Sequence, residues 1–181
     1  LRSRLEQKTQ TIEALQLQPL DSSIIKRFDY VSAKVINNST QSFKNYITVN
    51  KGRLDGIAPG MAVISSRGAI GKVKSVSDHY AVLISLLNTD EQLSSTIKRT
   101  GYFGTIQWGG TDPRLADLHY IPRHVDPQVG DTIVTSGYNA IFPENILVGT
   151  VASVKLSKEA PFYDIKVQLV QDFRSLAFCE I

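Results

Sequence analysis

Residues 130–149, GDTIVTSGYNAIFPENILVG, contain two β-rich runs separated by a turn-rich loop. The first run is residues 132–135, TIVT, and the second begins at Leu147 and continues to Val151. β-branched residues bounded by Gly and Pro are typical of strands and tight turns. The stretch therefore predicts two strands joined by a turn at Gly137 and a loop that contains Phe142.

An earlier part of the chain repeats this pattern. Residues 60–65, GMAVIS, correspond to residues 130–135, and residues 71–76, GKVKSV, correspond to residues 149–154, GTVASV. The second copy has a longer loop between its strands, residues 138–146. Such a repeat predicts two related β units rather than one large sheet. Coincidence between strands rich in Gly, Val and Ser is the alternative.

Short strands separated by frequent turns are predicted from residue 31 to the end of the chain, five before residue 90 and seven after it. This pattern is typical of sandwiches and barrels, not of a parallel α/β sheet. We place a domain boundary at residues 88–93, which are polar and are expected to form an exposed connector with few contacts. The predicted units are residues 31–90 and 91–181. If both are six-stranded, one late strand returns to the first unit.

The first 17 residues are rich in Leu, Glu, Gln, Arg and Lys and contain no Gly or Pro, which favours a helix. We predict a helix over residues 1–18 that is the end of a coiled coil, followed by a connector over residues 19–30 that begins with Pro19. The alternative is an amphipathic helix that packs on its own domain. The residues of the predicted coiled-coil seam, which would mediate self-association, are Leu1, Leu5, Ile12 and Leu15.

The composition is that of an ordinary globular protein, with 181 residues, 42% hydrophobic residues and a net charge of +3. This charge is too small for a nucleic-acid footprint, which needs a clustered basic face. The lone Cys179 cannot form an intrachain disulfide and is expected to be a small buried hydrophobe. The chain begins in a helical pattern without Met, so we expect a fragment that lacks an N-terminal targeting part.

No catalytic or metal-binding constellation is recognisable, so we predict a non-enzymatic protein without cofactors. Ser136 lies in a Thr-Ser-Gly turn without the flanking residues of a nucleophile elbow. The three histidines, His79, His119 and His124, lack metal-ligand spacing. Asp131 is expected to cap a turn at the start of its strand. A trypsin-like hydrolase and a soluble ligand-binding β-barrel are the alternative functions.

Several short motifs, taken in order, resemble the extracytoplasmic part of the rod-shape-determining MreC family. This sequence departs from the family pattern at Glu144-Asn145, because the family more often has Gly after Phe-Pro. The motifs are residues 50–52 (NKG), Gly56-Ile57, 59–64 (PGMAVI), 68–73 (GAIGKV), 99–101 (RTG), 130–137 (GDTIVTSG), Phe142-Pro143 and 148–151 (VGTV).

The resemblance implies a helix followed by two small six-stranded barrels of chymotrypsin-like topology. It also implies a scaffold of cell-wall elongation that maintains rod shape. The implied partners are the penicillin-binding transpeptidase and the glycosyltransferase of elongation, MreD and MreB, with self-association into a dimer or filament. The implied location is the periplasmic face of the inner membrane, with one membrane anchor in the full-length protein.

A binding protein without catalytic residues needs exposed apolar side chains as anchors. The inserted loop supplies the candidates, whose alternative is packing under their own barrel. The partner-binding candidates are Tyr138, Ile141, Phe142 and Pro143, and the structural motif around them is Gly130, Asp131, Gly137 and Gly149.

Overall fold

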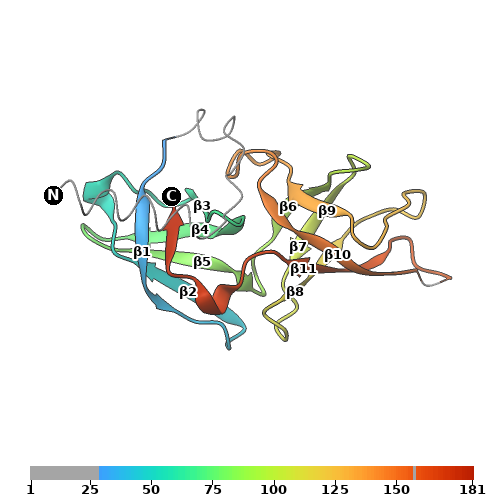
Figure 1. The fold of residues 1–181 in the computed structure, drawn as a ribbon, viewed down its shortest axis with the longest axis horizontal. Coiled ribbons are helices and arrows are strands. Elements are labelled where there is room, and N and C mark those ends of the chain that lie inside the picture. The colour runs from blue at the N-terminus through green and yellow to red at the C-terminus, as the bar shows by residue number, and fades with distance from the viewer. Residues whose placement is uncertain (1–28, 157) are drawn as a thin grey trace, which may run out of the picture.

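The computed structural model describes residues 29–156 and 158–181. Within these residues the chain forms twelve β-strands and two short 3-10 helices (Figure 1). The helices are η1 (Arg53–Asp55) and η2 (Phe173–Ser175). The strands are β1 (Ser32–Asn38), β2 (Lys44–Val49), β3 (Ala62–Ile64), β4 (Ala69–Val76), β5 (Ala81–Asn88), β6 (Leu93–Ile97), β7 (Phe103–Gln107), β8 (Leu115–His119), β9 (Thr132–Thr135), β10 (Leu147–Lys155), β11 (Asp164–Leu169) and β12 (Phe178–Glu180).

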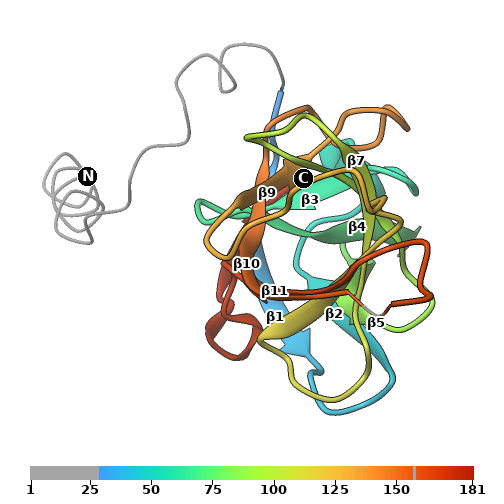
Figure 2. The same cartoon turned by 90° about the vertical axis from the view of Figure 1, so that its right-hand side faces the viewer.

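The strands form two closed antiparallel barrels of six strands each. The first has the order β1-β12-β3-β4-β5-β2, and the second has the order β10-β11-β8-β7-β6-β9. The barrels lie end to end, the first at the left and the second at the right of Figure 1. Figure 2 views the same pair along its length, with the second barrel in front. The two six-stranded barrels confirm the mainly-β part of the predicted fold class, whereas the predicted helix over residues 1–18 lies outside the described residues.

Both barrels have the same cyclic strand order. If β12 is counted as the first strand of the first barrel, each barrel runs first-second-third-sixth-fifth-fourth around its circumference. The first barrel is therefore completed by the last strand of the chain, which pairs with β1 and β3. Cys179 points inward from β12 and is buried, and this burial raises its pKa to about 12. Its thiol is a small core group, as the sequence predicts.

The internal repeat is also a repeat of strand register. In each copy the central glycine, Gly71 or Gly149, pairs with the middle of the preceding strand, at Val63 or Ile133. In each copy the residue before this glycine is left out of the pairing and forms a β-bulge. A second bulge, against the next strand, follows three residues after the glycine in both copies. The same registers and bulges in both barrels argue against coincidence.

The interior of each barrel is filled by its own side chains. Along β11 the exposed and buried residues alternate strictly, so one face of the strand supplies core residues. The side chains with almost no exposed surface are mostly aliphatic and include Ile47, Ile70, Leu83 and Leu87 in the first barrel and Ile97, Leu118, Ile133 and Ile165 in the second. Filled barrels of this size do not favour the ligand-binding alternative.

The prediction of an exposed connector over residues 88–93 holds only in part, because Asp90 and Gln92 are exposed but Thr89 and Glu91 are half-buried. Asn88 and Leu93, at its two ends, are buried. Between them, Glu91 forms an ion pair with Lys72 of β4 at 2.9 Å. The polar composition of the segment reflects these local contacts. A polar run between two strands does not reveal from sequence alone which neighbours it will meet.

A second junction contact lies at the turn between β3 and β4. The ideal Cβ position of Gly68 lies only 2.1 Å from the carbonyl oxygen of Leu147 in the second barrel. The Ser65 hydroxyl donates to Oε1 of Gln171 at 2.6 Å, and Gln171 directly follows the second barrel. A glycine at position 68 therefore allows the two barrels to touch through their backbones. This close approach explains one of the family motifs quoted above.

Candidate interaction surface

Asp131 anchors the first half of the stretch at residues 130–149. Its Oδ1 accepts from Nε of Arg99 at 2.6 Å, and its Oδ2 accepts from Nη2 of Arg99 at 2.8 Å. The same carboxylate accepts from the backbone N–H of Gln128 at 2.9 Å, which closes the turn before β9. Arg99 also donates to the Asp126 carbonyl oxygen at 2.6 Å. Asp131 thus caps a turn, as predicted, and ties the end of β6 to the start of β9.

Replacing Asp131 by asparagine is expected to lower the free energy of unfolding by about 1–2 kcal/mol at pH 7, since Arg99 loses its charged partner. The hydrogen bonds from Arg99, and then that from Gln128, hold the pKa of Asp131 below its usual range. The carboxylate therefore stabilises the fold above the unfolded-state pKa near 4, and this contribution is lost as pH falls through the lowered pKa.

Urea denaturation of both proteins between pH 7 and pH 3 measures this effect. The stability difference should shrink as the pH falls below 4, because protonation then removes the charge from the native protein as well. Asp90→Asn is the matched control, since Asp90 forms an ion pair with Lys44 in which both side chains are largely exposed. An equal loss of stability in both variants would contradict the assigned role.

The loop after β9 is held in one conformation by its turns. Gly137 has a φ of 69°, the left-handed conformation that its Ser-Gly turn predicts, and Ala140 and Asn145 also have positive φ. The backbone N–H of Tyr138 donates to the Ser136 hydroxyl at 3.3 Å. The Thr135 hydroxyl donates to the Pro143 carbonyl oxygen and accepts from the N–H of Ile146. The loop is thus fixed to the end of β9 at both of its ends.

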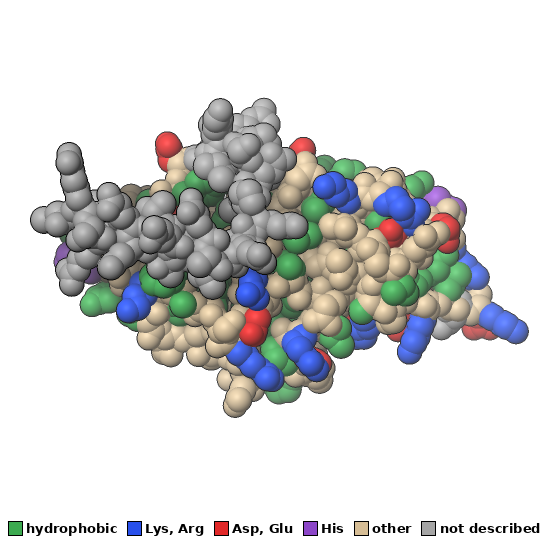
Figure 3. Space-filling model, viewed as in Figure 1, with side chains coloured by type: hydrophobic (Ala, Val, Ile, Leu, Met, Phe, Trp, Pro, Cys, Tyr) green, Lys and Arg blue, Asp and Glu red, His purple; other side chains and the backbone are tan. Residues whose placement is uncertain are grey.

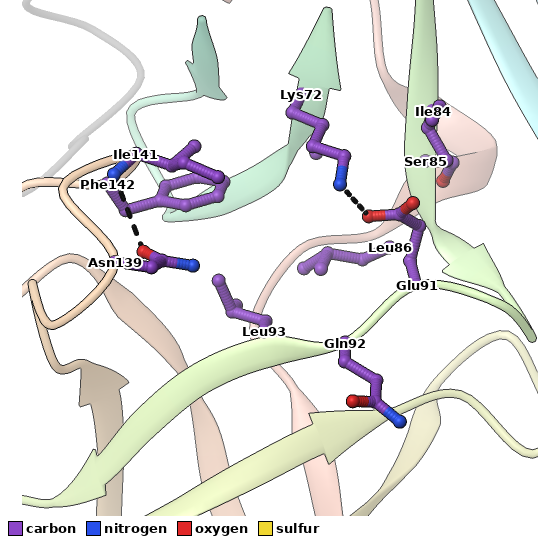
Figure 4. A pocket seen from close by; sticks show the side chains of 11 residues that line it. Lys72, Ile84, Ser85, Leu86, Glu91, Gln92, Leu93, Asn139, Ile141 and Phe142 are labelled. Carbon is purple, nitrogen blue, oxygen red and sulfur yellow. Dashed lines mark hydrogen bonds and ion pairs between the residues drawn. The ribbon is translucent and has the colours of Figure 1, made fainter. Parts of the chain in front are cut away.

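One side of this loop faces the first barrel. Ile141 and Phe142 line a small cavity of about 50 Å³ together with Leu86 of β5 and Leu93 of β6 (Figure 4). The ion pair of Lys72 with Glu91 borders the same cavity. Phe142 retains only 6% of its surface exposed. The inner side of the loop is therefore an apolar contact between the two barrels.

The other side of the loop is exposed. Tyr138 has 85% of its surface accessible and lies beside Phe103 of β7, which is 60% exposed, with ring centroids 6.3 Å apart. Between the loop and the sheet lies a shallow groove of about 210 Å³. It is lined by Thr96, Lys98, Phe103, Val134, Thr135, Ser136, Glu144 and Asn145.

The four partner-binding candidates differ in how exposed they are in the structure. Tyr138 is exposed, and Ile141 and Pro143 are half-buried. Phe142 is buried at the barrel junction, so the expectation of an exposed anchor at this position was wrong. Phe103 was missed, although it begins a strand in which exposed and buried residues alternate. An alternating strand preceded by a turn predicts which face is exposed, but not which loop will lie beside it.

Residues that a hydrolase or a metal site would use are placed in structural contacts. The ring of His124 packs edge-on against that of Tyr102, and His119 packs against Tyr120. The Ser136 hydroxyl lies 2.7 Å from the Ser94 hydroxyl, an arrangement that pairs two serines and supplies no general base. These positions do not favour the hydrolase alternative. The four residues of the predicted coiled-coil seam, Leu1, Leu5, Ile12 and Leu15, lie outside the described residues.

Charged side chains are dispersed on the face of the second barrel that Figure 3 shows. On the face seen in Figure 3, Lys and Arg side chains are spread around the second barrel and alternate with Asp and Glu. Such a surface does not form the clustered basic face that nucleic-acid binding needs. Of the helices in residues 29–156 and 158–181, none combines the length and hydropathy of a membrane span.

Comparison with known families decides the assignment. A family described as rod shape-determining protein MreC, barrel core, matches residues 35–180. The chain belongs to the MreC family. The cell shape-determining protein MreC of Listeria monocytogenes serovar 1/2a is 31% identical over 137 residues, which are 74% of this chain and 46% of the relative. That of Bacillus subtilis (strain 168) is 30% identical over 175 residues, with coverages of 86% and 60%.

The chain thus spans about half the length of the curated relatives that it matches. The membership confirms the family resemblance that the sequence motifs indicate. It also agrees with the prediction that the chain is not an enzyme, since the relatives are named for the determination of cell shape.

Solved MreC structures have the same fold. MreC from Pseudomonas aeruginosa has a TM-score of 0.78 at 23% identity, covering 85% of this chain and 99% of that one. The major periplasmic domain from the cell shape-determining filament MreC has a TM-score of 0.70 at 24% identity, covering 84% and 93%. MreC in a complex with Penicillin-Binding Protein (PBP2) from Helicobacter pylori has a TM-score of 0.60 at 15% identity, covering 84% and 98%.

Proposed function

We propose that this chain is the barrel region of a non-enzymatic scaffold for cell-wall elongation, located on the periplasmic side of the inner membrane. In this role it links the penicillin-binding transpeptidase and the glycosyltransferase of elongation to MreD and MreB. The observation that carries the proposal is membership of the MreC family over residues 35–180. The complex of a structural neighbour with a penicillin-binding protein supports the choice of the first partner.

The architecture supports a scaffold because the two barrels are joined at several separate places. The Gly68 turn and the buried side of the loop at Phe142 each connect the two barrels, and the Lys72–Glu91 ion pair ties the connector between them to β4. In addition, Asn38 of β1 donates to the carbonyl oxygen of Phe173 at 2.6 Å, on the segment that returns to the first barrel. A rigid pair of barrels can hold two partners at a fixed separation without conformational work.

Self-association through the seam of Leu1, Leu5, Ile12 and Leu15 belongs to the same proposal. A coiled coil next to the barrels would bring two copies together, and an N-terminal membrane anchor in the full-length protein would keep them at the membrane surface. The exposed tip of the loop, with Tyr138 at its centre and the half-buried Ile141 and Pro143 beside it, is the proposed contact for the transpeptidase.

The proposal is tested by the binding of the purified full-length protein, in detergent or nanodiscs, to the penicillin-binding transpeptidase of the same organism. Biolayer interferometry should detect binding, and Tyr138→Ala should weaken it by about 30-fold if Tyr138 is a central anchor. Tyr80→Ala is the matched control, because Tyr80 is an exposed tyrosine on the first barrel. Absence of binding by the wild-type protein would refute the transpeptidase link. Equal weakening by Tyr138→Ala and Tyr80→Ala would exclude the loop as the contact and would leave the transpeptidase link intact.

A further inference from the structure

The groove on the second barrel combines an aromatic ring with several polar side chains. The docking of a protein partner does not require this composition. One wall is the exposed ring of Phe103, and the other is the loop at Glu144 and Asn145. The rest of its lining includes three hydroxyl side chains and only one aliphatic side chain, Val134. An aromatic wall opposite a set of polar groups suits a ligand that has one apolar face and several hydrogen-bonding groups around its edge.

Four of the six polar side chains that line the groove are available for a ligand. Within residues 29–156 and 158–181, no hydrogen bond or ion pair occupies the side chains of Thr96, Lys98, Glu144 and Asn145. Together they offer a hydroxyl, an ammonium, a carboxylate and an amide, which are both donors and acceptors. Charges of both signs at one small site favour a neutral ligand that is rich in hydrogen bonds over an ion.

The groove is held in shape by the structure around it. Ser136, which lines the groove directly after β9, is joined to Ser94 of β6 through their hydroxyl groups, 2.7 Å apart. The Glu144 side chain rests against the backbone of Gly137, where an added Cβ would lie 2.3 Å from its Cγ. Thr135 fixes the loop from below through its hydrogen bonds to Pro143 and Ile146. A site that is formed in advance spends less binding free energy on ordering.

We propose that this groove binds one pyranose ring of an oligosaccharide. The apolar face of the sugar ring stacks on Phe103, and its equatorial hydroxyl or acetamido groups bond to Thr96, Glu144 and Asn145. The volume of about 210 Å³ lies below that of pockets that enclose a drug-sized ligand, and therefore suits a single ring of an extended chain. Since the groove is open along the sheet surface, the neighbouring rings of the chain extend into solvent.

The groove adjoins the proposed transpeptidase contact, since the rings of Phe103 and Tyr138 lie 6.3 Å apart, but it is lined by other side chains. The transpeptidase is proposed to meet the loop tip at Tyr138, whereas the sugar contacts Thr96, Phe103 and Glu144. The saccharide proposal therefore goes beyond the proposed scaffold function and stands or falls separately from it.

The test is a titration of the isotopically labelled full chain with hexa-N-acetylchitohexaose, followed by amide chemical shifts. We expect saturable shifts at Thr96, Phe103 and Ser136 with a dissociation constant on the order of 1 mM, as is reasonable for a shallow site. Cellohexaose, which lacks the acetamido groups, should bind more weakly if these groups make the expected hydrogen bonds.

Two variants test the assigned contacts. Thr96→Val removes the hydroxyl with little change in shape and should weaken binding by about 5-fold, and Phe103→Ala should weaken it by about 5-fold or more. Phe178→Ala is the matched control, because Phe178 is an equally exposed phenylalanine on the first barrel. No saturable shift up to 10 mM, about ten times the expected dissociation constant, would overturn the proposal, as would shifts that map elsewhere. Loss of transpeptidase binding, but not of saccharide binding, in Thr96→Val would also overturn it, because the groove would then belong to the protein contact.

Discussion

Replacing Gly149 by valine is expected to lower the free energy of unfolding by about 3 kcal/mol or more. An ideal Cβ at this position would lie 2.2 Å from the carbonyl oxygen of Gln168 and 2.7 Å from Cγ1 of Val167, both on the neighbouring strand β11. A backbone oxygen cannot move aside without breaking the β10–β11 pairing. For a chain of this size the melting temperature should fall by about 6–12 °C, which thermal unfolding followed by circular dichroism measures.

Gly130→Ala is the control for the conformational part of this effect. Gly130 has a φ of 93°, but an added Cβ would meet nothing within 4 Å. Its replacement should therefore cost only the left-handed strain, about 1–2 kcal/mol. Gly137→Ala should be similar to Gly130→Ala, because the group that it would displace is the flexible Glu144 side chain. A Gly149→Val protein as stable as Gly130→Ala would show that β10 and β11 can move apart with little loss of stability.

The repeat predicts that Gly71 is equally sensitive. Its Cβ would lie 2.0 Å from the carbonyl oxygen of Ile84, the equivalent neighbour in the first barrel. Both positions therefore require glycine for the same physical reason, which is the close approach of the next strand beside a β-bulge. Sequence comparison of the two halves can find both positions, because the pattern Gly-x-Val-x-Ser-Val survives in each.

Local features of the fold were predictable because they depend on neighbours in sequence. Alternation of β-branched and polar residues predicts strands such as β11, and Gly in a turn predicts the positive φ at Gly137. Each of these features is set by a few consecutive residues. The same is true of the cap at Asp131, which bonds to the N–H three residues before it.

Features that depend on distant residues were not predictable in the same way. The ion pair of Arg99 with Asp131 joins residues 32 positions apart. Gly68 must be a glycine because of Leu147 in the other barrel. Nothing in the residues around either position identifies its distant partner. The contacts of the connector at residues 88–93 with Lys72 and Lys44 were not foreseen for this reason, since both lysines lie on strands of the first barrel.

The loop at residues 138–146 has features set by its own sequence and features set by distant residues. Its hydrophobic residues could be exposed anchors or core residues, and the local sequence is the same in either case. The first barrel decides the outcome, because it supplies the apolar surface on which Ile141 and Phe142 lie. Tyr138, only three residues before Ile141, points to solvent.

Phe142→Ser is therefore expected to behave as a core substitution. Loss of a buried aromatic side chain typically costs about 3–5 kcal/mol, and here it would also enlarge the cavity between the barrels. The melting temperature should fall by about 6 °C or more, whereas binding to the transpeptidase, measured per folded molecule, should be retained. Tyr138→Ser is the matched control and should change stability by less than about 0.5 kcal/mol because the side chain is exposed. The opposite result, with an unchanged melting temperature and lost binding in Phe142→Ser, would mean that the loop leaves the first barrel when the partner binds. The barrel junction would then be a switchable contact, and Phe142 would be the anchor that moves between the two surfaces.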